Sequence, residues 1–330
     1  MTEFRDALFA QPENLGAAAR ACAQRIADAD LTGLREGTIV LSGIGASAHA
    51  LIPAVLALRA AGRRAFAVSS SELAGAAAAR LGDAYVLVSQ SGASTETVQA
   101  LGELDGAPVV AVSARGESPL AQAATVWLPL GPHPDTPVAT LSYTATLQTL
   151  GMLCDTLVAG RPDPSWERMP ELAAEVLTRC DPIAEELAGA FAQVHALDAA
   201  GGGAGAAAAA ETALLGREGL RLPATGMETR TYLHGPLEAV GPGFGVVLFG
   251  SGRELSLVAS VQSYGAEVAL ISDAPDAAGP HVFALPHAGP LAAPILQILP
   301  AQLLVEHVAR LRGLSIGELA RHQDDTKVVV

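Results

Sequence analysis

The sequence alternates apolar runs with short polar turns, and one such boundary is unusually rich in hydroxyl groups. Four residues, Tyr85 to Val88, are followed at once by the turn Ser89-Gln-Ser-Gly92. A short apolar run of this kind is typical of a buried parallel strand. Ser94, Thr95 and Thr97 come next, where the pattern predicts that a helix begins.

A strand-to-helix turn of this composition suits an anion. Hydroxyl groups and backbone N–H groups are predicted to point at one spot, where the helix N-terminus adds partial positive charge. The turn contains no Lys or Arg, so a bound phosphate would rest on neutral donors. The alternative is a capped turn without a ligand. Five hydroxyl residues between Ser89 and Thr97 favour the phosphate.

The same pattern recurs later in the chain, which predicts two copies of one parallel α/β unit. The segment Val86–Gly92 aligns with Val246–Gly252, so that Ser91 and Ser251 are 160 positions apart. Each segment is an apolar run that ends in a Ser-Gly turn. Two further pairs of segments match at nearly the same offset: Val109–Ser113 with Ala269–Asp273, and Val40–Ser47 with Leu197–Gly205.

Composition narrows the class of protein. The 330 residues are 50% hydrophobic and 16% charged, which predicts a folded chain long enough for two α/β domains. A formal net charge of -14 without a Lys/Arg cluster argues against a nucleic-acid partner. The N-terminal residues lack the pattern of a signal peptide, and no apolar run is long enough to predict a membrane span. We therefore expect a cytoplasmic protein.

Cysteine and histidine spacing predicts no metal site. Cys22, Cys154 and Cys180 show no CxxC or metal-type spacing, and we expect them to be reduced and buried. The histidines outside the motifs below also lack ligand spacing, and we expect no metal and no cofactor. They are His49, His133, His195, His281, His287, His307 and His322.

A dinucleotide site is the main alternative for the first glycine loop. Gly43-Ile-Gly45 follows a predicted strand and precedes a helix, as in a dinucleotide fingerprint. NAD would need an acidic residue at the end of the next strand to hold the ribose. That strand, Ala65–Val68, ends instead in three serines, with Glu72 after them. A serine cluster suits a sugar phosphate better than a ribose diol.

The serine turn, together with the loop Gly45-Ala-Ser47, resembles the first half of a sugar isomerase (SIS) domain pair. This family includes the isomerase part of glucosamine-6-phosphate synthase and stand-alone amino-sugar-phosphate isomerases and deaminases. The resemblance implies an α/β fold of two tandem SIS domains, each a flavodoxin-like parallel sheet flanked by helices. The expected parts are an N-terminal helix (1–24), a phosphate-binding SIS domain (25–160), a connecting helix (161–195), and a second SIS domain with a C-terminal tail (196–330).

The resemblance also implies which residues hold the substrate. The family's phosphate-binding turn falls on Ser89, Gln90, Ser91 and Ser94. Further substrate contacts fall on Gly45, Ser47, Val138 and Thr140. Two family positions differ here, because Ala46 replaces a Thr and Leu141 replaces a Lys.

Three residues carry the chemistry that the resemblance implies. Glu218 is expected to move a proton between C1 and C2, and His234, in the motif His-Gly-Pro-Leu, to open the sugar ring. Lys327, the only lysine in the chain, is expected to bind the open-chain sugar, since a lysine amine can act as a nucleophile. One lysine of the family is replaced in this chain. Leu215 stands at its position, three residues before Glu218.

These expectations predict an isomerase or isomerising deaminase for an amino-sugar or hexose 6-phosphate, such as glucosamine 6-phosphate. We expect a homodimer, with His234 contributed by the neighbouring subunit, and no part of the sequence is predicted to form a glutaminase domain. The losses at Ala46, Leu141 and Leu215 favour an alternative, a non-catalytic sensor that binds a sugar phosphate. The sequence does not distinguish isomerase, deaminase and deglycase, and it does not name the sugar.

Overall fold

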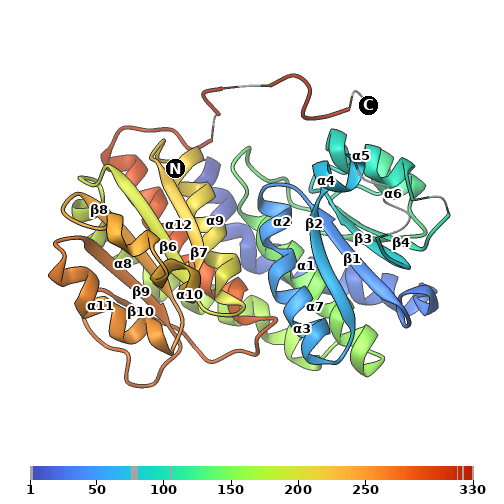
Figure 1. Ribbon diagram of the computed structural model, residues 1–330, viewed down its shortest axis with the longest axis horizontal. Coiled ribbons are helices and arrows are strands. Elements are labelled where there is room, and N and C mark those ends of the chain that lie inside the picture. The colour runs from blue at the N-terminus through green and yellow to red at the C-terminus, as the bar shows by residue number, and fades with distance from the viewer. Residues whose placement is uncertain (1–2, 76–80, 105, 318, 322, 329–330) are drawn as a thin grey trace. The chain divides into compact units, whose positions relative to one another are not determined.

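The chain folds into two compact units, each built on its own parallel sheet (Figure 1). The computed structural model describes residues 3–75, 81–104, 106–317, 319–321 and 323–328. We call the units the sheet-1 unit and the sheet-2 unit. The sheet-1 unit comprises Glu13–His133, Leu141–Met169 and Ala320–Val330, and the sheet-2 unit comprises Met1–Pro12, Pro134–Thr140 and Pro170–Leu319.

The sheet of the sheet-1 unit has, among the described residues, the strand order β2-β1-β3-β4-β5, with every pair parallel. The central strands β3 and β4 are buried along their whole length, which explains their uninterrupted apolar sequence. The strands are β1 (Thr38–Gly43), β2 (Arg64–Ser69), β3 (Ala84–Val88), β4 (Val109–Ser113) and β5 (Val126–Pro129).

Helices cover both faces of this sheet. Leu73 of α4, Ala100 of α5 and Leu120 of α6 form a core with the side chains of β1, β3 and β4 on one face. The helix pair α3 and α7 packs together, and α3 contacts β1 and β2. The helices are α2 (Ala46–His49), α3 (Leu51–Ala60), α4 (Ser70–Gly75), α5 (Thr95–Gly102), α6 (Pro119–Ala123) and α7 (Leu141–Ala159), and α1 (Glu3–Asp28) contributes residues to both units.

The sheet-2 unit repeats this topology. Its strand order is β7-β6-β8-β9-β10. When the strands of each unit are numbered along the chain, both sheets have the order 2-1-3-4-5. The predicted α/β fold of two tandem parallel units is therefore confirmed. The strands are β6 (Ala196–Gly201), β7 (Ala224–Glu228), β8 (Phe244–Phe249), β9 (Glu267–Ser272) and β10 (Val282–Ala284).

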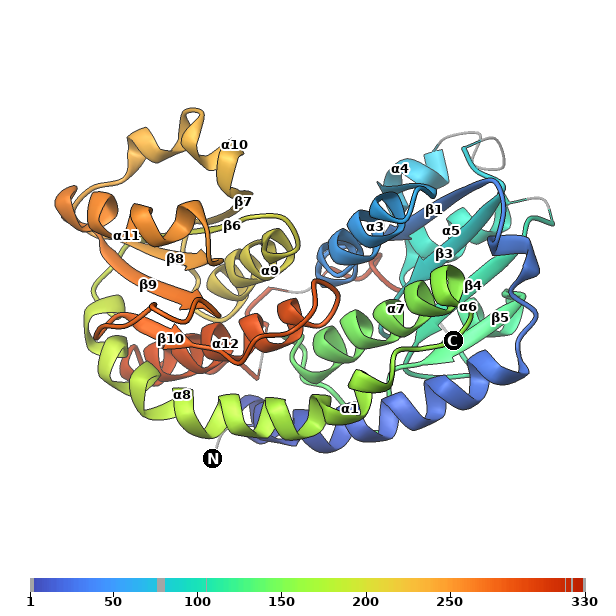
Figure 2. The same cartoon turned by 90° about the horizontal axis from the view of Figure 1, so that it is seen from below.

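In the sheet-2 unit, α11 packs on one face of the sheet and α9 with α12 on the other (Figure 2). Small residues let α9 approach the strands closely: a Cβ on Gly226 of β7 would lie 2.5 Å from the carbonyl oxygen of Ala209. The Gly/Ala-rich segment is thus a packing surface. The helices are α8 (Met169–Phe191), α9 (Gly205–Glu218), α10 (Thr229–Leu233), α11 (Arg253–Ser263) and α12 (Ala293–Leu311), and short 3₁₀ turns cover Thr32–Leu34, Pro164–Arg168 and Pro236–Ala239.

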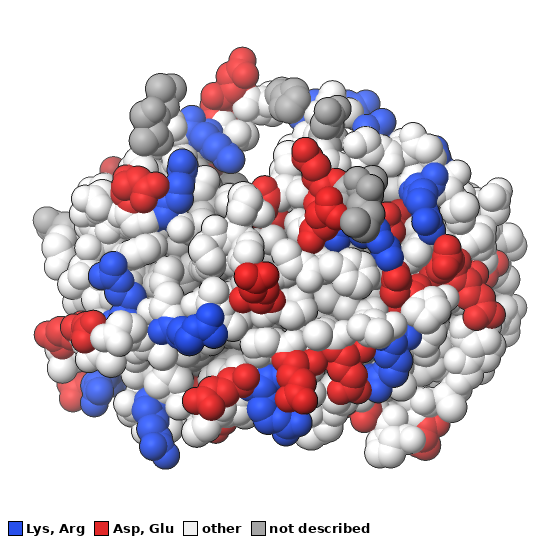
Figure 3. All heavy atoms as spheres, turned by 180° about the vertical axis from the view of Figure 1, so that it is seen from behind, with Lys and Arg blue, Asp and Glu red and all other residues white. Residues whose placement is uncertain are grey.

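The distribution of surface charge, the helices and the burial of the cysteines agree with the expectations from the sequence. Acidic and basic side chains are interspersed on the face seen in Figure 3, which shows no large area of one sign. Within the described residues, no helix combines the length and apolar character that crossing a membrane requires. The three cysteines are buried free thiols, as predicted, and burial raises the pKa of Cys22 to about 12 and that of Cys180 to about 11.

Candidate functional site

The serine turn lies at the switch point of the first sheet. Strand β1 pairs with β2 on one side and with β3 on the other. The order in which strands are added to the sheet therefore reverses between β1 and β3. The loop that contains Gly45 and Ser47 follows β1, and Ser89 follows β3. Both therefore lie at the carboxyl edge of adjacent parallel strands, the position where open α/β sheets bind ligands.

Ser89 organises the turn. Its side chain is 1% exposed, and its Oγ accepts hydrogen bonds from the backbone N–H groups of Gly92 at 3.1 Å and Ser94 at 3.4 Å. The hydroxyls of Ser89 and Ser94 lie 2.9 Å apart. The Oγ of Ser91 accepts a bond of 3.2 Å from the N–H of Ala93. The structure thus brings Ser89, Ser91 and Ser94 together, with Gln90 exposed beside them.

Two of the five hydroxyl groups do not point at this spot, so the expected convergence is only partly correct. The Thr97 hydroxyl is fully buried and donates to the Oγ of Ser70 at 3.0 Å. The Thr95 hydroxyl donates instead to the carbonyl oxygen of Asp325 at 2.7 Å. The cause is that Thr97 lies on the inner face of α5, whereas Thr95 faces the C-terminal tail.

The C-terminal tail pairs with the serine turn. Ser94 and Lys327 form an isolated antiparallel β-bridge. The N–H of Val328 donates to the carbonyl oxygen of Ala93 at 2.9 Å, and the N–H of Thr95 donates to that of Thr326 at 3.2 Å. This backbone pairing places Lys327, whose side chain is exposed, beside the turn. Sequence patterns gave no signal for these backbone contacts.

The glycine loop after β1 has the conformation that its sequence requires. Gly45 has φ +59°, a region that favours glycine, and no heavy atom lies within 4 Å of the position of a Cβ there. Its carbonyl oxygen accepts hydrogen bonds from the N–H groups of Ala48 and His49. Ser47 is half-buried in the first turn of α2. The open space at Gly45 leaves the backbone accessible at the switch point.

Val138 and Thr140 lie on a loop that belongs to the sheet-2 unit. Both side chains are fully buried. The hydroxyl of Thr140 donates to the carboxylate of Asp135, whose oxygens also accept the backbone N–H of Thr140 at 3.1 and 3.2 Å. Sequence reasoning missed Asp135, which holds this loop in shape. Its only signal was an acidic residue within a Pro/Thr-rich segment.

Glu218 is the last residue of α9 and is half-buried. Leu215, at the position of the missing family lysine, is fully buried. A lysine at that position would have its ammonium group buried away from water, which is costly. The leucine instead packs into the core. Arg217, the residue before Glu218, donates through Nε to the carbonyl oxygen of Ala224 at 2.8 Å and so connects α9 to the start of β7.

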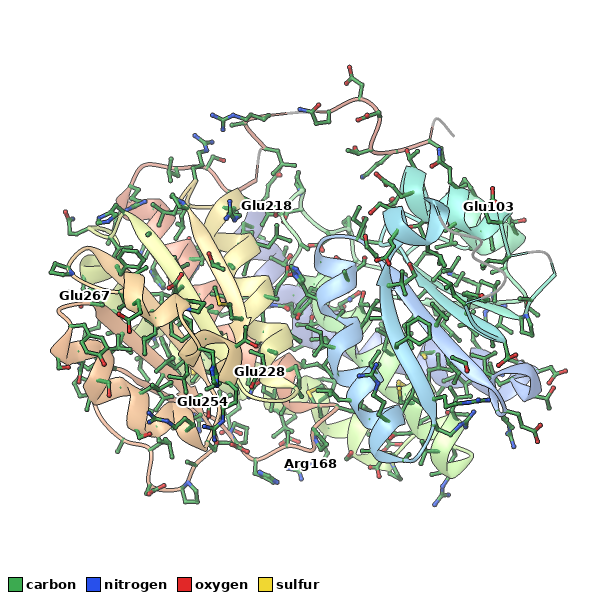
Figure 4. All side chains as sticks on the ribbon, in the orientation of Figure 1. Glu103, Arg168, Glu218, Glu228, Glu254 and Glu267 are labelled. Carbon is green, nitrogen blue, oxygen red and sulfur yellow. The ribbon has the colours of Figure 1, made fainter. Side chains whose placement is uncertain are left out.

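Glu218 and His234 of one chain lie at opposite edges of the second sheet. Glu218 precedes β7, and exposed His234 follows the short helix after β7. Figure 4 shows Glu218 and Glu228, the last residue of β7, at opposite ends of this strand. Five extended residues span about 16 Å. The two groups therefore do not meet within one sheet-2 unit.

One curated relative extends over most of the chain. Glutamine–fructose-6-phosphate aminotransferase [isomerizing] of Pseudomonas syringae is 30% identical over an alignment of 258 residues, and the match covers 71% of this chain and 42% of the relative. The chain thus spans less than half the length of that relative. No family model matches the sequence.

Solved structures share the fold over nearly the whole chain. Glucosamine-6-phosphate deaminase from Thermotoga maritima superposes with a TM-score of 0.81 at 19% identity, covering 99% of this chain and 100% of that one. Tagatose-6-phosphate ketose/aldose isomerase from Escherichia coli superposes with a TM-score of 0.81 at 20% identity, covering 100% of this chain and 96% of that one. At these identities the likeness establishes the fold.

Proposed function

Because the chain belongs to the double sugar isomerase (SIS) domain family, we propose that it is an isomerase or isomerising deaminase for an amino-sugar 6-phosphate. The observation that carries the proposal is the pairing of the tail with the serine turn. It holds the chain's only lysine beside a set of hydroxyl groups at the switch point of the first sheet.

The phosphate group of the substrate is assigned to the serine turn. Ser89, Ser91 and Ser94 offer hydroxyl groups at the N-terminus of α5, where the helix dipole favours an anion. Gln90 adds an exposed amide, and the loop with Gly45 and Ser47 borders the same edge. Val138 and Thr140 are proposed to contribute to sugar binding through their loop.

The chemistry is assigned to Glu218, His234 and Lys327. His234 opens the ring by acid–base catalysis, and Glu218 moves a proton from C2 to C1 of the open-chain sugar. For a 2-amino sugar this transfer leaves an imine at C2, and water then releases ammonia and a ketose. Lys327 binds the open-chain carbonyl.

We further propose a homodimer, which the separation of Glu218 and His234 supports. The two residues lie at opposite edges of the second sheet, so a site that uses both would take His234 from a second copy of the chain. This arrangement agrees with the expectation from the family resemblance.

The proposal is tested with glucosamine 6-phosphate and other hexose 6-phosphates, by measuring ammonia and fructose 6-phosphate. Glu218→Gln is expected to lower kcat by about 100- to 10,000-fold, the usual range for a group that transfers a proton. Glu267→Gln, at an exposed position of β9, is the matched control and is expected to keep full activity. Full activity of Glu218→Gln would refute the assigned mechanism.

A sugar-phosphate sensor is the second candidate, and buried Leu215 favours it because no cation stands at that position on α9 to tune Glu218. A sensor would be stabilised against heat by hexose 6-phosphates without turning any of them over. Measurable isomerisation or ammonia release would exclude it.

A further inference from the structure

The second unit contains the counterpart of the serine turn, with two carboxylates beside it. Its switch point lies between β6 and β8, beside the Gly201–Gly205 loop and the turn Gly250–Gly252. This turn is three residues shorter than the serine turn, and two acidic residues lie beside it: Glu254, the second residue of α11, and Asp273, directly after β9.

The Glu254 carboxylate occupies this turn. The residue is 4% exposed, and its Oε2 accepts the N–H of Gly252 at 3.3 Å, while the hydroxyl of Thr229 donates to its Oε1. A Cβ on Gly250 would lie 2.6 Å from Oε2, and one on Gly202 would lie 2.9 Å from Oε1. The loops after β6 and β8 and the end of β7 therefore enclose the carboxylate.

Figure 4 shows Glu254 at the same end of the sheet as Glu228 and far from Glu218. This end is the carboxyl edge, because Glu228 is the last residue of β7. The groups around Glu254, a backbone N–H at the start of an eleven-residue helix and a threonine hydroxyl, are donors of the kind that bind phosphate. In this unit they bind a side chain of the same chain.

The second acidic residue, Asp273, accepts a hydrogen bond from the serine of this turn, Ser251. The hydroxyl of Ser251 donates to Oδ1 of Asp273, whose other oxygen lies 2.7 Å from Nδ1 of His287. Burial raises the pKa of Asp273, but the hydrogen bonds from Ser251 and His287 outweigh it and hold that pKa below its usual range. Asp273 therefore remains ionised at neutral pH and adds a second negative charge beside the turn.

We propose that the carboxyl group of Glu254 fills the place of a phosphate at the switch point of the sheet-2 unit and keeps that unit from binding one. A phosphate cannot use these donors while the Glu254 side chain occupies them. The role of Glu254 depends neither on turnover nor on ligand binding at Ser89.

The test is chemical rescue of Glu254→Ala by inorganic phosphate. The variant is expected to have a lower Tm than the unmodified protein, and phosphate is expected to restore it more than chloride at the same ionic strength. The matched control is Glu267→Ala, at an exposed position of the same unit. A Tm gain from phosphate that is no larger for Glu254→Ala than for Glu267→Ala would overturn the proposal.

Amide chemical shifts locate the effect. Addition of phosphate is expected to shift the Gly252 resonance saturably in Glu254→Ala and to leave it unchanged in the unmodified protein and in Glu254→Gln, where the side chain still fills the space. A saturable Gly252 shift in the unmodified protein would also overturn the proposal. The Gly92 resonance reports separately on the serine turn, so failure of the proposed function there is distinguished from failure at Glu254.

Discussion

Lys327 lies opposite Ser94 in an antiparallel bridge, so the tail is fixed to the turn by its backbone. Two flanking backbone hydrogen bonds and the bond from the Thr95 hydroxyl to Asp325 reinforce the pairing. None of these contacts uses the side chain of Lys327. The ammonium group is therefore available to a ligand while the backbone holds its position.

Replacing Lys327 by arginine or alanine tests this separation of roles. Because the pairing is made by the backbone, both variants are expected to keep the thermal stability of the unmodified protein. Both are expected to lose about 100-fold or more in kcat, since neither side chain offers a nucleophilic amine. Steady-state kinetics and thermal unfolding, measured on the same samples, check both statements. Equal activity of Lys327→Arg would show that only charge is needed.

Gly92 is the residue of the turn that tolerates substitution least. It has φ +66°, and a Cβ there would lie 2.0 Å from the Oγ of Ser118. Gly92→Ala is expected to destabilise the protein by about 2–3 kcal/mol, of which the backbone conformation accounts for about 1–2 kcal/mol. Gly62→Ala is the matched control: φ is +78° and nothing lies within 4 Å, so only the conformational cost remains. Urea unfolding of the two variants measures the difference, and equal losses would contradict the predicted clash.

The fold could be predicted because the same pattern of apolar runs and turns occurs twice in the sequence. Apolar runs such as Tyr85–Val88 and Val246–Phe249 are buried strands in equivalent positions, and local pattern suffices to find them. The tail could not be predicted in this way. Thr95 and Asp325 are 230 positions apart, and their contact joins a hydroxyl to a backbone carbonyl, which leaves no trace in residue type. For the same reason the sequence grouped Thr95 and Thr97 with the ligand-binding hydroxyls.

Mixing two inactive variants tests whether His234 acts across a dimer. Glu218→Gln and His234→Ala are each expected to be inactive. If each site combines Glu218 of one chain with His234 of its partner, a mixed dimer regains one complete site. Random exchange of subunits then restores about a quarter of the unmodified activity, because half of the dimers are mixed and each has one working site. Activity assays before and after dissociation and reassociation measure this. No recovery in mixtures shown to contain mixed dimers would contradict the shared site.

Acid is expected to weaken the sheet-2 unit through Asp181. Its carboxylate accepts bonds of 2.6 and 3.2 Å from Arg5 and lies 2.7 Å from Nε2 of His307, while Arg5 also reaches Glu306 at 3.0 Å. Burial alone would raise the pKa of Asp181, but the hydrogen bonds from Arg5 and His307 outweigh it and lower that pKa.

A carboxyl group whose pKa is lower in the folded than in the unfolded protein stabilises the fold above its unfolded pKa, about 3.9 for Asp. This contribution is lost as the pH falls through the lower, folded value. Asp181→Asn is expected to cost about 2 kcal/mol at pH 7, where the charged hydrogen bonds are lost. The gap to the unmodified protein is expected to narrow below about pH 4. Urea unfolding across this range measures the gap, with exposed Asp276→Asn as the control. A gap that stays constant between pH 7 and pH 3 would show that Asp181 contributes by packing rather than by charge.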